Sequence, residues 1–557
     1  MKNIFLHLII FLGIMSSGAQ TPPLVGPYLQ SPTSSSIKVK WWTDSLSVSS
    51  GKVMYGTAPG ALSQTAIDTT TTTKHTVSIT GLSPDTKYYY AIYNDNTFVE
   101  GNDAEHWFKT FPAPGITKPI RAWVIGDFGK GNDKQARVRD AYEAYDTVGT
   151  DLWLWLGDNA YADGTEAEFL SKVFDSTYGY RNQMKHWAFE PSPGNHDYNS
   201  VSPIISPKPP LQHAGPYYDL VDVYQHGEAG GIPTGHELFY SFDYANAHFI
   251  SLNTEVGNLF SAADDWTGVC LTGSFTGSPQ TQWLIQDLQA NTKPWVIVYF
   301  HQPPYTDGSH ESGAFYEVYM RAMRKYFAPI WEQYGVDLVI CGHTHVYERS
   351  YLVKGCYTES TDITSDNYLS TNNGIEAQGQ AFVKYTQGFN ANMGTVYVNN
   401  GNSGSSETGA GFNHPYMFSE YGCDTCCGSF VLDINGDRLD GRHINLRGEE
   451  IDHFTMFKVD GSSAIKEAKD DMGALQVIPN PFSKTTTLAF DLAAAGNVKV
   501  TLLDMNGRSV EVFAGLLQPG KQLISIDATK LQLAKGVYTV NVIAGTINRS
   551  QTIIHIE

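Results

Sequence analysis

Residues 151–158 form a short apolar run that ends in an acidic residue, and they read Asp151-Leu152-Trp153-Leu154-Trp155-Leu156-Gly157-Asp158. Three similar runs span residues 122–125, 294–300 and 337–341, and they are followed by Gly126-Asp127, His301 and Gly342-His343. Continuous apolar runs of this length are typical of strands that are buried on both faces. Each predicted strand therefore ends at a side chain that could bind a metal ion.

Segments with helical character separate these runs, and they span residues 133–145, 166–174, 281–290 and 315–334. Strands that alternate with helices predict a layered α/β fold, in which helices flank the β-sheets. In such folds the chemistry lies at the carboxyl ends of the strands. We therefore expect the polar residues that follow the four runs to meet at one edge of the sheets.

The segment before this region is predicted to be all-β. Residues 37–41 alternate between apolar and polar side chains, as a half-buried strand does, and residues 81–90 contain Leu82-Ser83-Pro84-Asp85-Thr86-Lys87-Tyr88. This stretch resembles the Leu-x-Pro-x-Thr-x-Tyr signature of fibronectin type III domains, which implies a β-sandwich. We expect a structural or docking module over residues 20–113, followed by a linker at residues 111–115.

The end of the chain has a different β-rich pattern. A polar linker at residues 462–473 precedes three motifs: Pro479-Asn480-Pro481-Phe482, Asp504-Met505-Asn506-Gly507-Arg508 and Gly536-Val537-Tyr538. Their combination resembles the C-terminal sorting domain of proteins that the type IX secretion system exports from Gram-negative bacteria. The resemblance implies a C-terminal β-sandwich over residues 472–557, the type IX machinery as a partner, and export across the outer membrane.

Five motifs carry the candidate chemistry, in the order Asp127-Phe128-Gly129, Gly157-Asp158-Asn159-Ala160-Tyr161, Gly194-Asn195-His196-Asp197, Val298-Tyr299-Phe300-His301 and Gly342-His343-Thr344-His345. Carboxylates favour hard cations, and imidazoles suit first-row transition metals. A carboxylate can also bridge two ions, as in two-metal hydrolases. Both His343 and His345 could reach a pair of ions if the chain bends between them.

The order of these motifs resembles the calcineurin-like metallophosphoesterases, and within them the purple acid phosphatases, over residues 121–402. Tyr161, three residues after Asp158, carries the resemblance to that subgroup. The resemblance implies a catalytic domain over residues 118–460 and makes residues 20–113 the N-terminal domain of such an enzyme. It implies that Fe(3+) binds to Asp127, Asp158, Tyr161 and His345, and that a divalent Fe, Zn or Mn ion binds to Asn195, His301 and His343, with Asp158 as the bridge.

The expected activity is hydrolysis of phosphate monoesters by a metal-bound hydroxide, in the manner of an acid phosphatase. His196 is the first candidate for the group that protonates the leaving oxygen, and Asp197 is expected to orient it. His310, in a Gly- and Ser-rich loop, is the second candidate. A phosphodiesterase or nucleotidase on the same metal core remains an alternative, and a non-catalytic adhesion protein is another.

A Ser-His-Asp hydrolase is not supported, because no Gly-x-Ser-x-Gly elbow lies in this region and Gly404-Ser405-Ser406 is expected to be an ordinary loop. The histidines at positions 213, 226 and 236 are interpreted as loop residues that rim a cleft and bind no metal.

Length and composition fit this organisation. The chain has 557 residues, of which 41% are hydrophobic, so three or more domains are expected. The formal net charge of −20 counts against a nucleic-acid binder, but not against small anionic substrates, because a metal site supplies local positive charge. Lys2, the apolar run 4–15 and small residues up to Ala19 predict a signal peptide over residues 1–19. No later segment is long and apolar enough to span a membrane, and we expect a secreted or cell-surface protein.

Export permits disulfide bonds among the six cysteines, which are Cys270, Cys341, Cys356, Cys423, Cys426 and Cys427. Structural disulfides are the favoured interpretation, and the pairing is open. A zinc site on Cys423, Cys426 and Cys427 is less favoured, because no second pair of ligands with matching spacing lies nearby.

Overall fold

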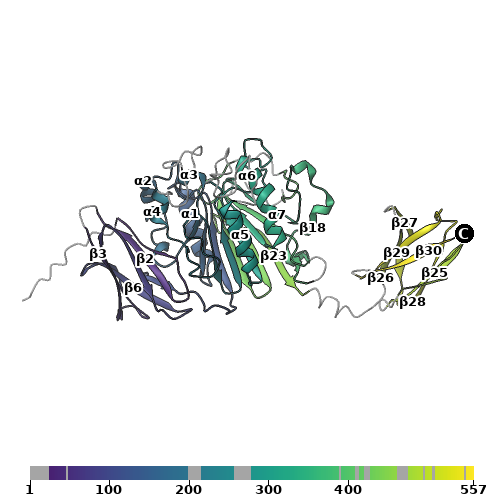
Figure 1. Cartoon of the computed structure of the whole chain (residues 1–557), viewed down its shortest axis with the longest axis horizontal. Coiled ribbons are helices and arrows are strands. Elements are labelled where there is room, and N and C mark those ends of the chain that lie inside the picture. The colour runs from purple at the N-terminus through teal and green to yellow at the C-terminus, as the bar shows by residue number, and fades with distance from the viewer. Residues whose placement is uncertain are drawn as a thin grey trace, which may run out of the picture. The chain divides into compact units, whose positions relative to one another are not determined.

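The structure, a computed structural model, describes residues 24–44, 48–198, 215–255, 278–387, 391–407, 413–418, 427–460, 475–492, 496–504, 508–544 and 547–556. The expected signal peptide, the linker 462–473 and His213 lie outside these residues. The chain divides into two compact units, Met1–Val459 and Asp460–Glu557, which are described separately. The first contains the N-terminal sandwich and the α/β domain (Figure 1).

The N-terminal part is a β-sandwich, as expected from its alternating sequence. One sheet has the order β1-β2-β5, and the other has the order β4-β3-β6-β7 with β8 paired to β6. The strands are β1 (Val25–Gln30), β2 (Ser36–Trp42), β3 (Ser49–Gly56), β4 (Gln64–Thr72), β5 (Lys74–Thr80), β6 (Lys87–Asn94), β7 (Thr97–Gly101) and β8 (Trp107–Lys109). Side chains of Val39, Trp41, Val53 and Tyr90 fill the core between the sheets.

A seven-stranded sheet carries the first group of candidate ligands, and its order is β11-β10-β9-β21-β22-β23-β19. The strands are β9 (Ile120–Ile125), β10 (Leu152–Leu156), β11 (Glu190–Ser192), β19 (Phe382–Tyr385), β21 (Gly428–Asn435), β22 (Arg438–Asn445) and β23 (Glu450–Val459). Strands β9, β10 and β11 run parallel to one another. The predicted strands at residues 122–125 and 151–156 are therefore confirmed, and their carboxyl ends lie at the same edge.

A six-stranded sheet carries the second group, in the order β12-β13-β14-β15-β20-β16. Its strands are β12 (Tyr240–Tyr244), β13 (Ala247–Ser251), β14 (Trp295–Phe300), β15 (Leu338–Cys341), β16 (Tyr347–Arg349) and β20 (Val396–Asn400). Strands β13, β14, β15 and β20 are parallel. A short pair, β17 (Leu352–Val353) and β18 (Tyr368–Ser370), lies beside it.

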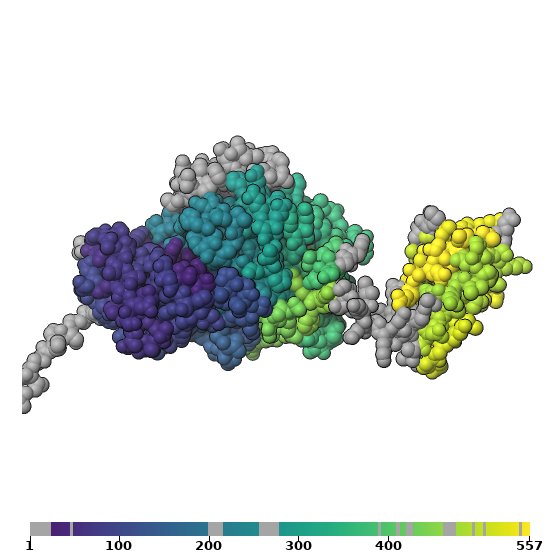
Figure 2. Space-filling view, turned by 60° about the horizontal axis from the view of Figure 1, so that its bottom comes forward, coloured from purple at the N-terminus to yellow at the C-terminus, as the bar shows by residue number. Residues whose placement is uncertain are grey.

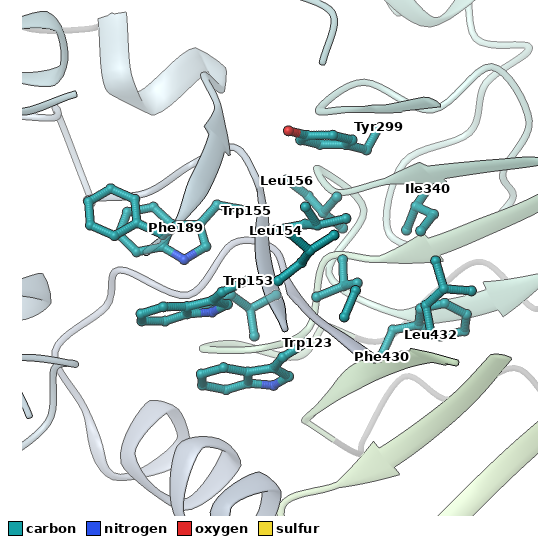
Figure 3. Close-up of a cluster of buried hydrophobic side chains, with 14 of the residues drawn as sticks. Trp123, Trp153, Leu154, Trp155, Leu156, Phe189, Tyr299, Ile340, Phe430 and Leu432 are labelled. Atoms are coloured by element: carbon teal, nitrogen blue, oxygen red, sulfur yellow. The ribbon is translucent and has the colours of Figure 1, made fainter. Parts of the chain in front are cut away.

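The two sheets share one hydrophobic core. Tyr299 and Ile340 of the six-stranded sheet belong to the same buried cluster as Leu154 and Leu432 of the seven-stranded sheet (Figure 3). On the other side of β9 and β10, Trp123 stacks on Trp153 with ring centroids 4.9 Å apart, and on Tyr142 of the first helix with centroids 4.4 Å apart. Both faces of these strands are thus buried, which explains their continuous apolar sequences.

Helices flank the sheets at α1 (Asp133–Tyr145), α2 (Glu166–Glu168), α3 (Asn195–Tyr198), α4 (Pro216–Leu220), α5 (Pro279–Ala290), α6 (Val318–Ala322) and α7 (Ala328–Gln333) (Figure 1). Helix α1 has the predicted bounds, and the Asn132 side chain caps its first turn by accepting a hydrogen bond from the Gln135 amide. Short π-helical turns extend α2 at Phe169–Val173 and join α6 to α7 at Met323–Phe327. Short 3₁₀ turns lie at Gln183–Lys185, Ser360–Asp362, Ser365–Asn367 and Glu376–Gln378.

The prediction of one helix over residues 315–334 is wrong in detail. The helical part begins at Val318 and changes to a π-helical turn before α7. Pro329 lies in the first turn of α7, and it has no amide hydrogen to bond to the preceding turn. The hydrogen-bond pattern therefore breaks before Pro329.

The N-terminal sandwich packs directly against the α/β domain. The Tyr28 hydroxyl donates to the Leu220 carbonyl over 3.0 Å, and the Gln30 amide donates to the Phe189 carbonyl over 3.1 Å. The Tyr90 hydroxyl donates to the Lys185 carbonyl over 2.8 Å. Figure 2 shows the surface of the sandwich continuous with that of the α/β domain.

The C-terminal unit is also built of two sheets, in the orders β24-β25-β28 and β27-β26-β29-β30. Its strands are β24 (Gln476–Ile478), β25 (Thr485–Leu492), β26 (Gly496–Asp504), β27 (Ser509–Leu517), β28 (Gly520–Asp527), β29 (Gly536–Ala544) and β30 (Ile547–His555). Leu488, Val500, Ile526 and Val540 form its core. Across the described residues, the search for a helix of sufficient length and hydropathy to cross a membrane found none.

Candidate metal centre

The candidate ligands follow the carboxyl ends of strands from both sheets. Asp127, Asp158 and Asn195 come after β9, β10 and β11, while His301 and His343 come after β14 and β15. His345 lies in the bend that leads to β16. Side chains separated by more than 200 residues are brought together in this way.

Tyr161, Asp127 and His345 form one side of the cluster. The Tyr161 hydroxyl donates to Asp127 Oδ1 over 2.9 Å and lies 3.1 Å from His345 Nε2. His345 Nε2 is also 3.4 Å from Asp127 Oδ1. Three potential donor atoms of different chemistry therefore face one another.

Asn195, His301 and His343 form the other side. Asn195 Oδ1 lies 3.1 Å from both His301 Nε2 and His343 Nδ1, and these two nitrogens are 3.2 Å apart. His301 Nε2 is 3.3 Å from Asp158 Oδ1. Single ligand atoms of Asp127, Asp158 and His301 all lie within 4.8 Å of one another, so Asp158 connects the two sides of the cluster.

The backbone at these positions is unusual. Asp127, Asp158 and His343 have φ values of 56°, 53° and 66°, in a region that residues other than glycine rarely adopt. A glycine is required at position 342, next to His343, because a Cβ atom there would lie 2.6 Å from Asp127 Oδ2. Strained backbone of this kind persists where the surroundings hold it, and it is concentrated at functional sites.

The charges in the cluster are strongly coupled. Burial opposes protonation of His301, but Asp158 and Asp127 outweigh it and raise its pKa to about 10. Burial together with the carboxylates of Asp127 and Asp158 raises the pKa of the Tyr161 phenol well above its ordinary range. Burial and the neighbouring His301 hold the pKa of His343 well below its ordinary value. Two buried carboxylates thus create a site of strong negative potential.

This donor set fits a pair of metal ions. Asp127 and Asp158 are 0% and 2% exposed, and within the described residues neither forms an ion pair with lysine or arginine. Buried carboxylates require compensating charge. Where an imidazole nitrogen faces a carboxylate, a proton or a metal cation must lie between the two groups. The mixture of carboxylate, imidazole, amide and phenol oxygen suits iron, zinc or manganese.

The structure places both candidate acid histidines beside the cluster. His196 Nε2 lies 3.8 Å from Asp158 Oδ2, and its Nδ1 hydrogen-bonds the Ala162 carbonyl. The His310 ring packs on His343 with centroids 4.3 Å apart, and its Nδ1 lies 2.8 Å from Glu317 Oε1. The catalytic roles of His196 and His310 stay predictions.

Asp197 has different contacts from those expected. Its carboxylate accepts hydrogen bonds from the Asn159 side chain over 2.9 Å and from the Gly194 amide over 2.8 Å. It therefore joins the loop after β10 to the loop after β11, rather than pairing with His196. Burial and the charge of Asp158 raise the pKa of Asp197 to about 8.

Three side chains near the cluster were not identified from the sequence. Glu407 Oε1 lies 2.8 Å from His345 Nδ1, and Ser405 Oγ lies 3.2 Å from the same atom. Residues 404–406 lie in a loop, as expected, and this loop contacts a candidate ligand through Ser405. Lys130 lies over the Tyr161 ring. No spacing rule points to these residues, since they are adjacent only in the folded chain.

The remaining histidines and cysteines have other surroundings. His226 is exposed, and the His236 ring packs on Phe239 with centroids 4.5 Å apart. Cys341, Cys356 and Cys427 are free thiols, so no disulfide joins these three. Cys270, Cys423 and Cys426 lie outside the described residues.

Comparison with family models gives three matches along the chain. Residues 22–110 match the purple acid phosphatase N-terminal domain, residues 120–347 match the calcineurin-like phosphoesterase family, and residues 476–557 match the secretion system C-terminal sorting domain.

Individual relatives agree with these matches. Purple acid phosphatase 1 of Ipomoea batatas is 27% identical over 62% of this chain and 69% of its own length. Fe(3+)-Zn(2+) purple acid phosphatase 12 of Arabidopsis thaliana is 26% identical over 55% of this chain and 60% of its own length. A purple acid phosphatase from yellow lupin (Lupinus luteus) seeds has a similar fold, with a TM-score of 0.54 at 18% identity, over 79% of this chain and 75% of the lupin chain. The chain therefore contains a calcineurin-like phosphoesterase domain, preceded by a purple acid phosphatase N-terminal domain and followed by a secretion system C-terminal sorting domain, and these domains make it a phosphoric ester hydrolase.

Proposed function

We propose that this protein is an exported phosphatase that hydrolyses phosphate monoesters at a centre of two metal ions. The observation that carries the proposal is the convergence of seven side chains from two sheets into one buried cluster. They are Asp127, Asp158, Tyr161, Asn195, His301, His343 and His345. The names of the relatives, which include an Fe(3+)-Zn(2+) enzyme, support the same activity.

The two sides of the cluster suggest how the ions would be divided. Asp127, Tyr161 and His345 would hold Fe(3+), and Asn195, His301 and His343 would hold a divalent Fe, Zn or Mn ion, with Asp158 shared between them. Bound there, the ions would polarise the phosphate oxygens and supply the attacking hydroxide near neutral pH. The phenol oxygen is the donor in this set that most favours a ferric ion. The side of the cluster that contains Tyr161 is therefore assigned to Fe(3+).

His196 is suited to hand a proton to the leaving oxygen. Its Nδ1 carries the proton that it donates to the Ala162 carbonyl, so the proton handed to the leaving oxygen would be a second one, held at Nε2 beside Asp158. The ring is partly exposed, so it can reach an alcohol that leaves toward solvent. Hydrogen bonding at Nδ1 fixes the ring orientation, which keeps Nε2 directed toward Asp158 and a substrate bound beside it.

His310 would act from the other side of the cluster. Its ring lies against His343, and Glu317 anchors its Nδ1. His310 Nε2 is then available to hydrogen-bond a phosphate oxygen that carries growing negative charge. The two histidines would thus contact different parts of the substrate.

The sorting domain supports a secreted or cell-surface location, and we propose the type IX machinery as the export partner. The signal peptide at residues 1–19 would direct the first membrane crossing. A chain lacking residues 472–557 should stay inside the outer membrane when expressed in a host with this machinery. Release of that truncated chain into the medium would contradict the proposal.

A substrate panel tests the activity. The purified protein should hydrolyse 4-nitrophenyl phosphate faster than bis(4-nitrophenyl) phosphate. It should hydrolyse a nucleoside monophosphate no faster than simple monoesters. A His301→Ala variant serves as the control for contaminating phosphatase. Faster cleavage of the diester or of nucleotides would reject the monoester assignment in favour of a phosphodiesterase or nucleotidase, and no hydrolysis of any ester would reject catalysis.

A further inference from the structure

A lysine lies directly against the candidate iron-binding phenol. Lys130 Nζ is 3.0 Å from the centroid of the Tyr161 ring. Within the described part of the chain, no carboxylate lies within ion-pair distance of this ammonium group, although the cluster beside it contains several acids. An ammonium group is attracted to the face of an aromatic ring because the ring face carries partial negative charge.

The two loops that carry Lys130 and Tyr161 are fixed to each other. The Tyr161 amide donates to the Gly129 carbonyl over 3.0 Å. Gly129 approaches so closely that a Cβ atom there would lie 1.9 Å from the Asn159 carbonyl oxygen. Because Lys130 is the next residue after Gly129, this contact holds its backbone beside the Tyr161 loop.

The Tyr161 ring is also in contact with His196, whose ring centroid is 4.4 Å away. The hydroxyl group points toward Asp127 and His345. The ring therefore has its oxygen in the metal cluster and its face next to a cation. A cation on the ring face can thus act on the electron density of the phenol without binding the metal.

We propose that Lys130 is a positioning residue that tunes Tyr161: its positive charge stabilises the phenolate form and withdraws electron density from the bond between the phenolate oxygen and the ferric ion. This inference rests on the proposed function, because it assumes iron at Tyr161. It adds to that function a residue with no ligand atom in the centre.

The charge of Lys130 has a predictable spectroscopic effect. The visible band of an iron phenolate arises when an electron moves from the phenolate to Fe(3+). A cation against the ring stabilises the negative charge before this transfer and loses that interaction afterwards, so it raises the transition energy. Removal of the cation should therefore move the band to longer wavelength.

The test compares visible spectra of iron-loaded proteins with matched metal content. Lys130→Met keeps the length of the side chain and removes its charge, so its absorption maximum should shift to longer wavelength. Lys130→Arg keeps the charge and should remain close to the unmodified protein. Lys134→Met is the matched control, because Lys134 is exposed and its Nζ contacts Ser406 Oγ, away from the ring. Lys130→Gln replaces Lys130→Met if the latter does not fold.

The outcomes separate this inference from the function on which it rests. A band at the same wavelength in Lys130→Met and in the unmodified protein would overturn the inference, and the phosphatase would stand. An equal shift in Lys134→Met would also overturn it, because the effect would then come from net charge. An active, colourless unmodified protein would overturn both the ferric assignment and the role of Lys130.

Discussion

Two clusters of buried charge in the α/β domain have opposite designs. Asp452 is fully buried and forms a bidentate pair with Arg349, at 2.6 Å and 3.0 Å, and it also accepts a hydrogen bond from the Tyr347 hydroxyl over 2.8 Å. Asp158 is equally buried, but it faces imidazoles, with His301 at 3.3 Å and His196 at 3.8 Å. The first cluster contains its own positive charge, and the second depends on charge that comes from outside the chain.

This difference shows how a structural acid can be distinguished from a functional one. A buried carboxylate that is paired with arginine is complete within the fold. Two carboxylates among imidazole, amide and phenol donors, on a strained backbone and without lysine or arginine paired to them among the described residues, form a site suited to metal cations. Substitutions in the first cluster should therefore reduce stability, and substitutions in the second should reduce catalysis.

The largest expected effect is on catalysis at the second cluster. Asp158→Asn keeps the shape of the side chain and removes the charge that both sides of the cluster share. Loss of a residue that merely supports a metal ligand costs 10–100-fold, so loss of a shared ligand should lower kcat/KM for a monoester by about 100-fold or more. The measurement is steady-state hydrolysis of 4-nitrophenyl phosphate together with metal content.

Asp433→Asn is the matched control for this substitution. Asp433 lies in the same domain and pairs with Arg121 at 2.7 Å. It therefore represents the kind of acid that is paired with arginine. Its variant should keep full activity per folded molecule. Equal activity in Asp158→Asn and Asp433→Asn would contradict the distinction between the two kinds of acid.

A smaller effect, on stability, is expected at the first cluster. Arg349→Met leaves Asp452 buried without its cation, which should lower the free energy of unfolding by about 3–5 kcal/mol. The melting temperature should fall, while the activity of the protein that remains folded should stay near normal. In the double variant Arg349→Met/Asp452→Leu, much of the stability should return, because no charge is left buried. A stable single variant with lost activity would contradict this assignment.

The smallest effect concerns a buried acid with neither arginine nor metal ligands around it. Glu190 lies at the interface with the N-terminal sandwich, where its Oε1 is 2.8 Å from the Tyr224 hydroxyl, and burial raises its pKa to about 8. Between the pKa of the unfolded chain, about 4.3, and about 8, the folded protein binds a proton that the unfolded chain lacks. The free energy of unfolding therefore falls as pH rises through this window.

Glu190→Gln removes this ionisation. The variant should gain stability relative to the unmodified protein by about 1–3 kcal/mol between pH 5 and pH 8, because relaxation around a buried charge reduces the full penalty. Melting temperatures of both proteins at the two pH values measure the difference. A difference that does not grow with pH would show that Glu190 is ionised in the folded protein.

Much of this arrangement could be predicted from the sequence. The apolar runs before Asp127, Asp158 and His301 predict buried parallel strands, and parallel strands bring their carboxyl ends to one edge. The order of the motifs then predicts that these residues meet. The start of α1 at Asp133 agrees with the cap at Asn132.

Other features depend on contacts that only the fold creates. Glu407 and Ser405 reach His345 from a loop about 60 residues later in the chain, and no local pattern marks them. Asp197 follows His196 directly, yet its carboxylate turns toward Asn159 and Gly194, because adjacent residues point in different directions. The π-helical turn before Pro329 was missed because helical periodicity does not show how a proline is accommodated.

Metal analysis together with the visible spectrum of the purified protein, with and without Tyr161→Phe, tests the central claim most directly. The unmodified protein should contain two metal ions per chain, one of them iron, and should show a visible band that is absent from Tyr161→Phe. A protein that binds no metal would contradict the two-metal centre. A fully active protein that holds only zinc or manganese and has no visible band would contradict the ferric site at Tyr161.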